Sequence, residues 1–182
     1  MRIGEKYSIA EYNVAFPMEE LEPLAAGYRV QFIPMTLIPG SDFKKIGDGL
    51  YRLKKRVLLM MGQTAGICWT YQRTDSGTNP NLISCRCVAK WLRPNGQWLE
   101  SPPAEKIWTP ETETSAGKVP RSNAIDYCLR GAMRLATEEL MGFNQPFTAD
   151  RLGRVFVLTR VLDADSARIQ HHAEKNIEEL YA

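Results

Sequence analysis

A long amphipathic helix pattern at about residues 121–141 limits the fold of this chain more than any other feature of its sequence. Apolar residues recur there at every third or fourth position, at Ile125, Leu129, Ala132, Met133, Ala136 and Leu140. The opposite face is predicted to carry polar residues four positions apart, namely Asp126, Arg130, Arg134 and Glu138. A helix with this pattern is stable only if its apolar face packs against another apolar surface.

An alternating stretch, Leu82–Leu92, predicts a strand that can supply this surface. Apolar residues alternate there with a more polar set that includes Arg86 and Lys90. Arg93–Gln97 contains the Pro, Asn and Gly residues of a tight turn, and a strand restarts at Trp98, which indicates a hairpin. We therefore expect an α+β fold in which an antiparallel β-sheet, built of β-hairpins, packs on one long α-helix.

Further segments complete this expected fold. Tyr28–Leu37 is rich in aromatic and β-branched residues and predicts a strand, in which Pro34 indicates an edge position or a bulge. A turn at Pro39–Asp42 is predicted to join it to a second strand at 47–53, so that the two form a hairpin. The remaining predicted elements are a basic helix at 54–64 and strands at Ile67–Arg73, Lys106–Trp108 and Arg154–Leu162.

The length of 182 residues fits a single domain, with a core at residues 1–162 and a C-terminal polar helix at 163–182. No apolar run approaches the roughly 20 residues of a membrane span, and the first residues lack the apolar stretch of a secretory signal, so we expect a cytoplasmic protein without a membrane partner. The cysteines form no C-x-x-C pair and have no nearby histidine, so the sequence predicts no metal site and no cofactor. All four are interpreted as small buried apolar residues, namely Cys68, Cys85, Cys87 and Cys128.

Positive charge is concentrated in the middle of the chain. The formal net charge is +2, but residues 51–134 carry 13 basic and 6 acidic side chains, a balance of +7 between flanking segments of −2 and −3. Such a region attracts a phosphate backbone independently of base sequence. The candidate DNA-binding residues are Arg52, Lys54, Lys55, Arg56, Arg86, Lys90, Lys118, Arg121, Arg130 and Arg134. The aromatic residues of this region, whose rings can stack on unpaired bases, are Tyr51, Trp69, Tyr71, Trp91, Trp98 and Trp108.

The sequence contains none of the common motifs of nucleophilic hydrolases, nucleotide-binding proteins or zinc proteases, so no catalytic residue is assigned. One alternative is a Mg²⁺-dependent nuclease, because Asp42-Phe43-Lys44 has the D-x-K spacing of such enzymes and Glu20 or Glu22 can supply a second carboxylate. The same segment also fits a simple turn. A third interpretation is a non-catalytic phage or plasmid structural oligomer, in which the basic centre of one subunit contacts the acidic ends of another.

Two stretches resemble a known family. Residues 49–59, followed by Thr64–Trp69, combine a strand and a basic helix with a final Ala-Gly-Ile-x-Trp phrase. Residues 123–162 combine a long helix that has an Arg-x-x-x-Arg face with the apolar strand Val155–Leu158. Together these features resemble the phage single-strand annealing proteins of the RecT/Redβ-like annealing recombinase superfamily.

This resemblance implies a β-β-β-α core, assembly into homo-oligomeric rings or filaments, and a basic groove that holds single-stranded DNA. It further implies ATP-independent strand annealing in phage-type homologous recombination, in the cytoplasm of a bacterial host, with a phage exonuclease or a host single-strand-binding protein as partner. The chain is shorter than the better-known members of the superfamily. The candidate residues named above rest on charge and periodicity, not on this resemblance.

Overall fold

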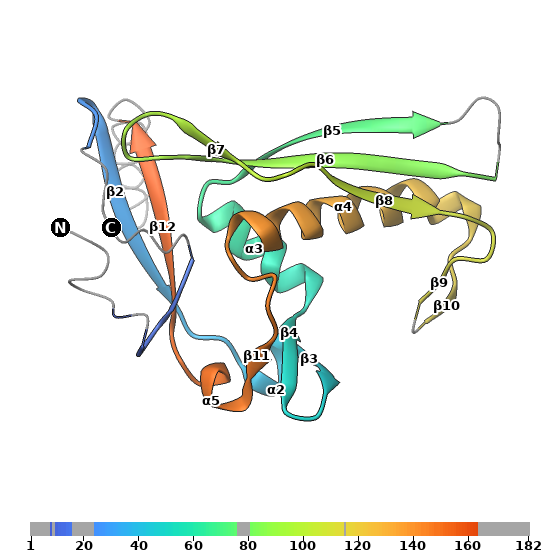
Figure 1. The fold of residues 1–182 in the computed structure, drawn as a ribbon, viewed down its shortest axis with the longest axis horizontal. Coiled ribbons are helices and arrows are strands. Elements are labelled where there is room, and N and C mark those ends of the chain that lie inside the picture. Colours follow the sequence, from blue (N-terminus) through green and yellow to red (C-terminus); the bar gives the residue numbers. More distant parts are fainter. Residues whose placement is uncertain (1–7, 9, 16–23, 76–80, 115, 164–182) are drawn as a thin grey trace, which may run out of the picture.

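The structure is a computed structural model that describes residues 8, 10–15, 24–75, 81–114 and 116–163. It has a mixed α+β fold, in which one long helix packs against the largest of several small sheets (Figure 1). The helix begins with a 3₁₀ turn, η1 (Arg121–Asn123), and continues as α4 (Ala124–Leu140). The expected fold class and the long helix at about 121–141 are therefore confirmed.

The largest sheet is antiparallel and is organised around one central strand. Its strands are β5 (Cys68–Asp75), β6 (Ile83–Leu92), β7 (Trp98–Glu100) and β8 (Ala104–Trp108). β6 pairs with the other three, and from Cys85 onward its buried residues alternate with exposed or half-buried ones, as predicted, whereas Ser84 is buried. These strands precede α4 in the chain, in agreement with the expected β-β-β-α order.

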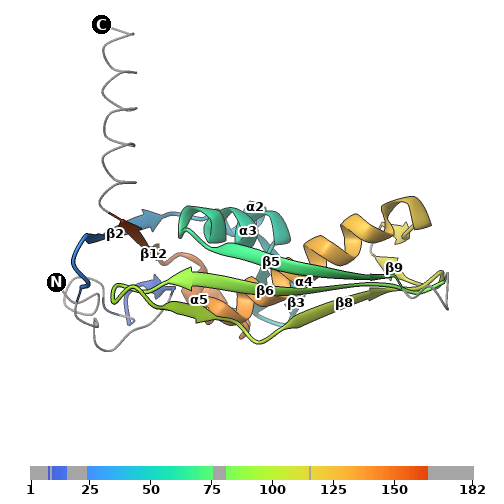
Figure 2. The ribbon, with the colours of Figure 1, turned by 90° about the horizontal axis from the view of Figure 1, so that it is seen from above.

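α4 covers one face of this sheet, and its contacts with β5 and β6 are specific. The thiol of Cys128 donates a hydrogen bond to the carbonyl of Ile83, with an S···O distance of 3.4 Å. The indole N–H of Trp69 donates to the hydroxyl of Thr137 at 3.0 Å. Figure 2 shows the opposite face of the sheet, over which no other described element packs.

A second sheet has the strand order β1–β12–β2, with bounds Asn13–Val14 for β1, Phe156–Asp163 for β12 and Tyr28–Met35 for β2. β2 pairs antiparallel with β12 along its whole length, and β1 pairs with β12 in parallel. β12 is almost entirely buried and needs a neighbour on both sides, whereas Pro34 lies on the edge strand, as predicted.

The predicted hairpin between Tyr28–Leu37 and 47–53 is wrong. Pro39–Asp42 forms a single helical turn, α2, in place of a tight turn, and the chain then enters the hairpin of β3 (Phe43–Gly47) and β4 (Leu50–Leu53). β2 takes β12 as its partner because that distant apolar strand offers eight residues of pairing.

The small elements connect these sheets. The predicted helix at 54–64 is α3 (Lys55–Thr64), and the remaining elements are β9 (Glu113–Thr114), β10 (Gly117–Lys118), β11 (Phe147–Thr148) and α5 (Ala149–Leu152). β11 pairs with β4, and four phenylalanine rings join this region to β12, with centroid distances of 5.5–6.0 Å between the rings of Phe43, Phe143, Phe147 and Phe156.

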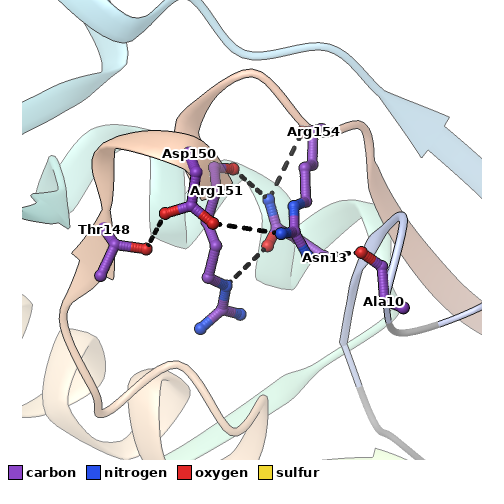
Figure 3. A network of polar contacts seen from close by, with 6 residues as sticks. All are labelled: Ala10, Asn13, Thr148, Asp150, Arg151 and Arg154. Carbon is purple, nitrogen blue, oxygen red and sulfur yellow. Dashed lines mark hydrogen bonds and ion pairs between the residues drawn. The ribbon is translucent and has the colours of Figure 1, made fainter.

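A polar network fixes the N-terminal segment beside α5 (Figure 3). The buried Asn13 amide donates to the carbonyls of Arg151 and Arg154, at 2.8 and 3.4 Å, and accepts from the Arg151 guanidinium at 3.2 Å. The Arg154 guanidinium donates to the Ala10 carbonyl at 2.6 Å and to the Asp150 carboxylate at 3.1 Å. These bonds satisfy the buried amide and hold β1 in register with β12.

Two predicted details of burial are wrong. The buried stripe of α4 includes Ala124, Cys128 and Glu138, whereas Ile125 is exposed, so the helix is rotated relative to the predicted apolar face. Ala124 and Cys128 have small side chains, which let the helix approach the sheet closely. Cys68 is exposed, whereas the other three cysteines are buried as expected.

Several expectations concern parts that the structure does not test. The predicted polar helix at 163–182 lies, apart from its first residue, outside the described residues, and the division into domains stays a prediction. No helix in the described ranges is long and apolar enough to cross a membrane.

Gly62 provides a test of the α3–α4 contact. A Cβ atom at this position would lie 3.1 Å from both Thr137 Cγ2 and Trp69 Cζ2, whereas a Cβ atom at the exposed Gly153 would meet nothing within 4 Å. We expect Gly62→Val to lower the free energy of unfolding by about 1–3 kcal/mol because the contact becomes overpacked. Denaturant unfolding measures this loss, and the same substitution at Gly153 is the control; equal effects at both positions would contradict the predicted close contact.

Candidate nucleic-acid interface

The ten candidate DNA-binding residues do not form one surface. Arg86 and Lys90 alternate with the buried residues of β6, so they lie on the sheet face opposite α4. The Lys90 ammonium is paired with the Glu100 carboxylate at 2.6 Å. Arg86 borders a shallow groove of about 360 Å³ whose other lining residues are Thr70, Tyr71, Gln72, Val88 and Pro103.

Two further candidates lie at the N-terminal end of α4. Arg121 is in η1 and Lys118 is in β10, at the end of the molecule where β9 and β10 project (Figure 1). Because an α-helix rises about 1.5 Å per residue, Arg121 lies roughly 13 Å along the helix from Arg130 and roughly 20 Å from Arg134. These two cations are therefore separate from the remaining six.

The remaining six candidates come from β4, α3 and α4, and we call them the basic helix surface: Arg52, Lys54, Lys55, Arg56, Arg130 and Arg134. α3 packs against α4, which brings Lys55 close to the arginines of the long helix. The pKa of Lys55 is lowered first by burial and then by the positive charge of Arg130, and Arg134 acts in the same direction. Asp126 opposes this shift. The positive charges of Lys55, Arg130 and Arg134 are thus close enough to affect one another.

The structure adds one residue to this surface. In the β3–β4 hairpin, Lys44 is the direct cross-strand neighbour of Arg52, and both side chains are exposed. Directly opposed residues in an antiparallel pair lie on the same face, so Lys44 extends the basic helix surface. This hairpin was not predicted from the sequence, although the Asp-Gly pair at 48–49 could have indicated it, because Asp-Gly favours a tight turn between strands.

The start of α3 departs from the usual charge pattern of helices. Lys54 occupies the N-cap without a side-chain capping bond, Lys55 and Arg56 follow in the first turn, and no acidic residue is present there. A helix N-terminus carries a partial positive charge, so each cation costs about 0.3–1 kcal/mol. Among the described residues, no ion pair is formed by any of these three side chains. The positive charge at this helix end is therefore not balanced by an ion pair with any described side chain, and Asp126, which acts on Lys55, is itself paired with Arg130.

The two arginines of α4 are, in contrast, paired along the helix. The Arg130 guanidinium contacts the Asp126 carboxylate at 2.6 Å, and the Arg134 guanidinium contacts both oxygens of Glu138 at 2.5 and 2.6 Å. Only 7% of Glu138 is exposed, and its burial raises the pKa of the carboxyl, which the charge and hydrogen bonds of Arg134 and the charge of Arg52 oppose. The prediction that Glu138 lies on the polar face of the helix, opposite the apolar one, was wrong, because Glu138 is one of the buried residues of α4.

A second shallow pocket, of about 370 Å³, adjoins this ion pair. Its charged and polar lining residues are Arg52, Glu138, Glu139 and Asn144. The two carboxylates make this pocket unfavourable for a phosphate.

The predicted aromatic residues contribute little to the basic helix surface. Trp91 and Trp108 are buried in the core, and Trp69 donates its indole hydrogen bond to α4. Tyr51, on β4 beside Arg52, is half-buried and packs against the core. The two strongly exposed rings, Tyr71 and Trp98, belong to β5 and β7. The surface is therefore suited to contacts with a phosphate backbone more than to base stacking.

The residues of the alternative nuclease site have ordinary structural surroundings. The Asp42 carboxylate accepts a hydrogen bond from the backbone N–H of Ile38 at 2.8 Å, which stabilises the turn of α2. The possible second carboxylates, Glu20 and Glu22, lie outside the described residues. Within the ranges that are described, no group of three or more His, Cys, Asp or Glu side chains is placed to hold a metal ion.

Comparisons with known proteins do not extend this description. No family model, no curated protein and no solved structure matches the chain. The class that can be stated is that of a mixed α+β protein with a basic surface between a hairpin and two packed helices.

The burial of Glu138 gives a pH dependence that can be measured. Because its folded-state pKa is raised, the folded protein binds more protons than the unfolded chain at pH values just above the ordinary pKa of 4.5. The stability of the wild type relative to Glu138→Gln should therefore fall as the pH rises through this window. Denaturant unfolding between pH 4 and 7 measures the difference, with Glu139→Gln as the control for loss of a neighbouring exposed carboxylate. If the stability of the wild type relative to Glu138→Gln increased with pH, the assigned burial of the Glu138 carboxyl would be contradicted.

Proposed function

We propose that this protein binds single-stranded DNA through the basic helix surface and promotes the annealing of complementary strands without ATP. The observation that supports this most strongly is the positive charge at the start of α3, where Lys54, Lys55 and Arg56 follow one another without an ion pair to any described side chain. A phosphate group at this position would be attracted by the side chains and by the N-terminus of the helix together. The exposed neighbours Arg52 and Lys44 provide a path for further phosphates.

The proposed mechanism is physical. Binding of a DNA strand neutralises like charges that lie close together and releases the counterions of the phosphates. Few exposed rings lie on this surface, so the bases of the bound strand are left unstacked by the protein and available for pairing with a second strand. Such an activity needs neither a nucleotide nor a metal ion, and it belongs in a compartment that contains DNA, such as the cytoplasm of a bacterial host.

Neutralising the start of α3 tests the binding surface. We expect the double variant Lys55→Gln/Arg56→Gln to bind single-stranded DNA more weakly for every base sequence. Each lost phosphate contact should also reduce the salt slope of log K by about 0.7. Fluorescence anisotropy of a labelled oligonucleotide at several salt concentrations measures both effects. The fold is expected to remain intact, because removing positive charge from a helix N-terminus stabilises the helix.

A matched control separates a local site from general loss of charge. Arg56→Gln and Arg29→Gln each remove one exposed guanidinium, the first from α3 and the second from the edge strand β2. The proposal requires a clearly larger loss of affinity at Arg56. Equal losses at the two positions, or unchanged binding in the double variant, would show that the basic helix surface is not the binding site.

Annealing is measured separately from binding, with two complementary oligonucleotides that carry a fluorophore and a quencher. The wild-type protein should accelerate quenching in the absence of nucleotide, and Lys55→Gln/Arg56→Gln should lose this acceleration. Binding without acceleration would reject annealing and leave the binding surface intact. Cleavage of the strands in Mg²⁺ that disappears in Asp42→Ala would favour the nuclease alternative.

A further inference from the structure

The edge strands of this protein differ in how they are protected against pairing with another strand. Any edge strand presents unpaired N–H and C=O groups, and charged residues, prolines and bulges prevent other strands from binding them. The edge strand β2 contains Arg29 and Pro34. The edge strand β3 contains Lys44 and Lys45, and its register shifts before Gly47. Both edges are therefore protected.

The side of the large sheet formed by β7 and β8 is protected as well. Pro102 and Pro103 separate these two short strands and cannot donate backbone hydrogen bonds. Glu105 and Lys106 place charges along β8. A straight strand from another molecule cannot pair continuously along this side of the sheet.

The opposite side of the same sheet is less protected, because the two charged residues of β5, Arg73 and Asp75, both lie within its last three residues. β5 is eight residues long, and its strand partner among the described residues is β6. Its first five residues, Cys68–Gln72, include no charged residue, proline or glycine. Apolar surface adjoins this edge, since the Tyr71 side chain is 61% exposed.

We propose that two copies of this chain associate by antiparallel pairing of β5 with β5, which joins their two large sheets into one. A strand that pairs with its own copy brings identical residues close together near the two-fold axis, so like charges there would repel. The uncharged stretch Cys68–Gln72 avoids this repulsion. Head-to-tail pairing of strands would require a second open edge of similar length. Among the described strands, the edges of β2, β3 and β8 are protected and the other edge strands are only two or three residues long, so we expect the contact to be symmetric and closed.

This arrangement has a consequence for the binding surface. Antiparallel extension of a sheet places the two-fold axis perpendicular to the sheet, so both α4 helices lie on the same side of the joined sheet. The two basic helix surfaces then also lie on that side, where two DNA strands can be held by one dimer. This consequence rests on the proposed function, whereas the dimer itself does not.

Charged substitutions on β5 test the dimer in the absence of DNA. Thr70 and Gln72 are exposed, and we expect the double variants Thr70→Lys/Gln72→Lys and Thr70→Glu/Gln72→Glu both to be monomeric, because either sign of charge opposes itself across the axis. Light scattering with size-exclusion chromatography at about 50 µM protein gives the masses. The matched controls Ile107→Lys and Ile107→Glu, at an exposed position of β8, should keep the wild-type mass. A wild-type mass of one chain or of an odd number of chains, or an even-numbered assembly that the β5 variants leave intact, would overturn the proposal.

Cysteine cross-linking tests the symmetry of the same contact. In a Cys68→Ser background, single cysteines at positions 70, 71 and 72 are oxidised, and the fraction of covalent dimer is measured. Only residues next to the two-fold axis come within the Cα separation of a disulfide, about 4.4–6.8 Å, so cross-linking should peak at one position. The remaining cysteines are buried, and burial raises the pKa of Cys87 and Cys128 to about 11, so these thiols should stay inert. Equal cross-linking at all three positions would reject a fixed pairing of β5, whether or not the protein binds DNA.

Discussion

The packing of α4 on β6 is the contact on which the rest of the structure depends. Ala124, Cys128, Ala132 and Ala136 recur every four residues along the helix, and all four are completely buried. Small side chains allow the helix backbone to approach the sheet closely, and Gly131 continues this close approach over β8, where a Cβ atom would lie 2.7 Å from Lys106 Cγ. The rotation of α4 that results turns Arg130 and Arg134 toward α3 and brings Glu138 into the protein.

Local patterns in the sequence predicted the elements of this contact well. The 3.6-residue period of α4, the two-residue period of β6 and the Pro-Asn-Gly turn before β7 all correspond to what the structure shows. Each of these signals depends on residues within one turn or strand of each other, so no knowledge of the tertiary structure was needed. The basic start of α3 was visible for the same reason, because Lys54, Lys55 and Arg56 are consecutive in the chain.

The features that depend on distant residues could not be predicted in this way. β2 and β12 are separated by more than a hundred residues, and nothing in Tyr28–Met35 shows that its partner is Phe156–Asp163 and not the nearer strand. The helical pattern alone also does not fix which face of α4 is buried, and the predicted face was rotated relative to the observed one. As a result, Ile125 was predicted to be buried and is exposed, whereas Glu138 was predicted on the polar face and is buried. For the candidate site, the sequence shows which cations are present and the four-residue spacing that pairs Arg130 and Arg134 with acidic residues of the same helix. The packing of α3 against α4, which brings Lys55 close to these arginines, is tertiary and could not be predicted from local patterns.

The difference between paired and unpaired cations explains why net charge is a poor guide to a binding surface in this protein. Arg130 and Arg134 lie in the centre of the basic region, but their charges are balanced by Asp126 and Glu138, so a phosphate would have to displace an existing partner. The three cations at the start of α3 have no such partner among the described residues, and they oppose the helix dipole. The free protein is therefore destabilised at this helix end, and a bound anion would convert that unfavourable interaction into a favourable one. The location of unbalanced charge, and not the total of +2, is the physical basis for the proposal that this surface binds a polyanion.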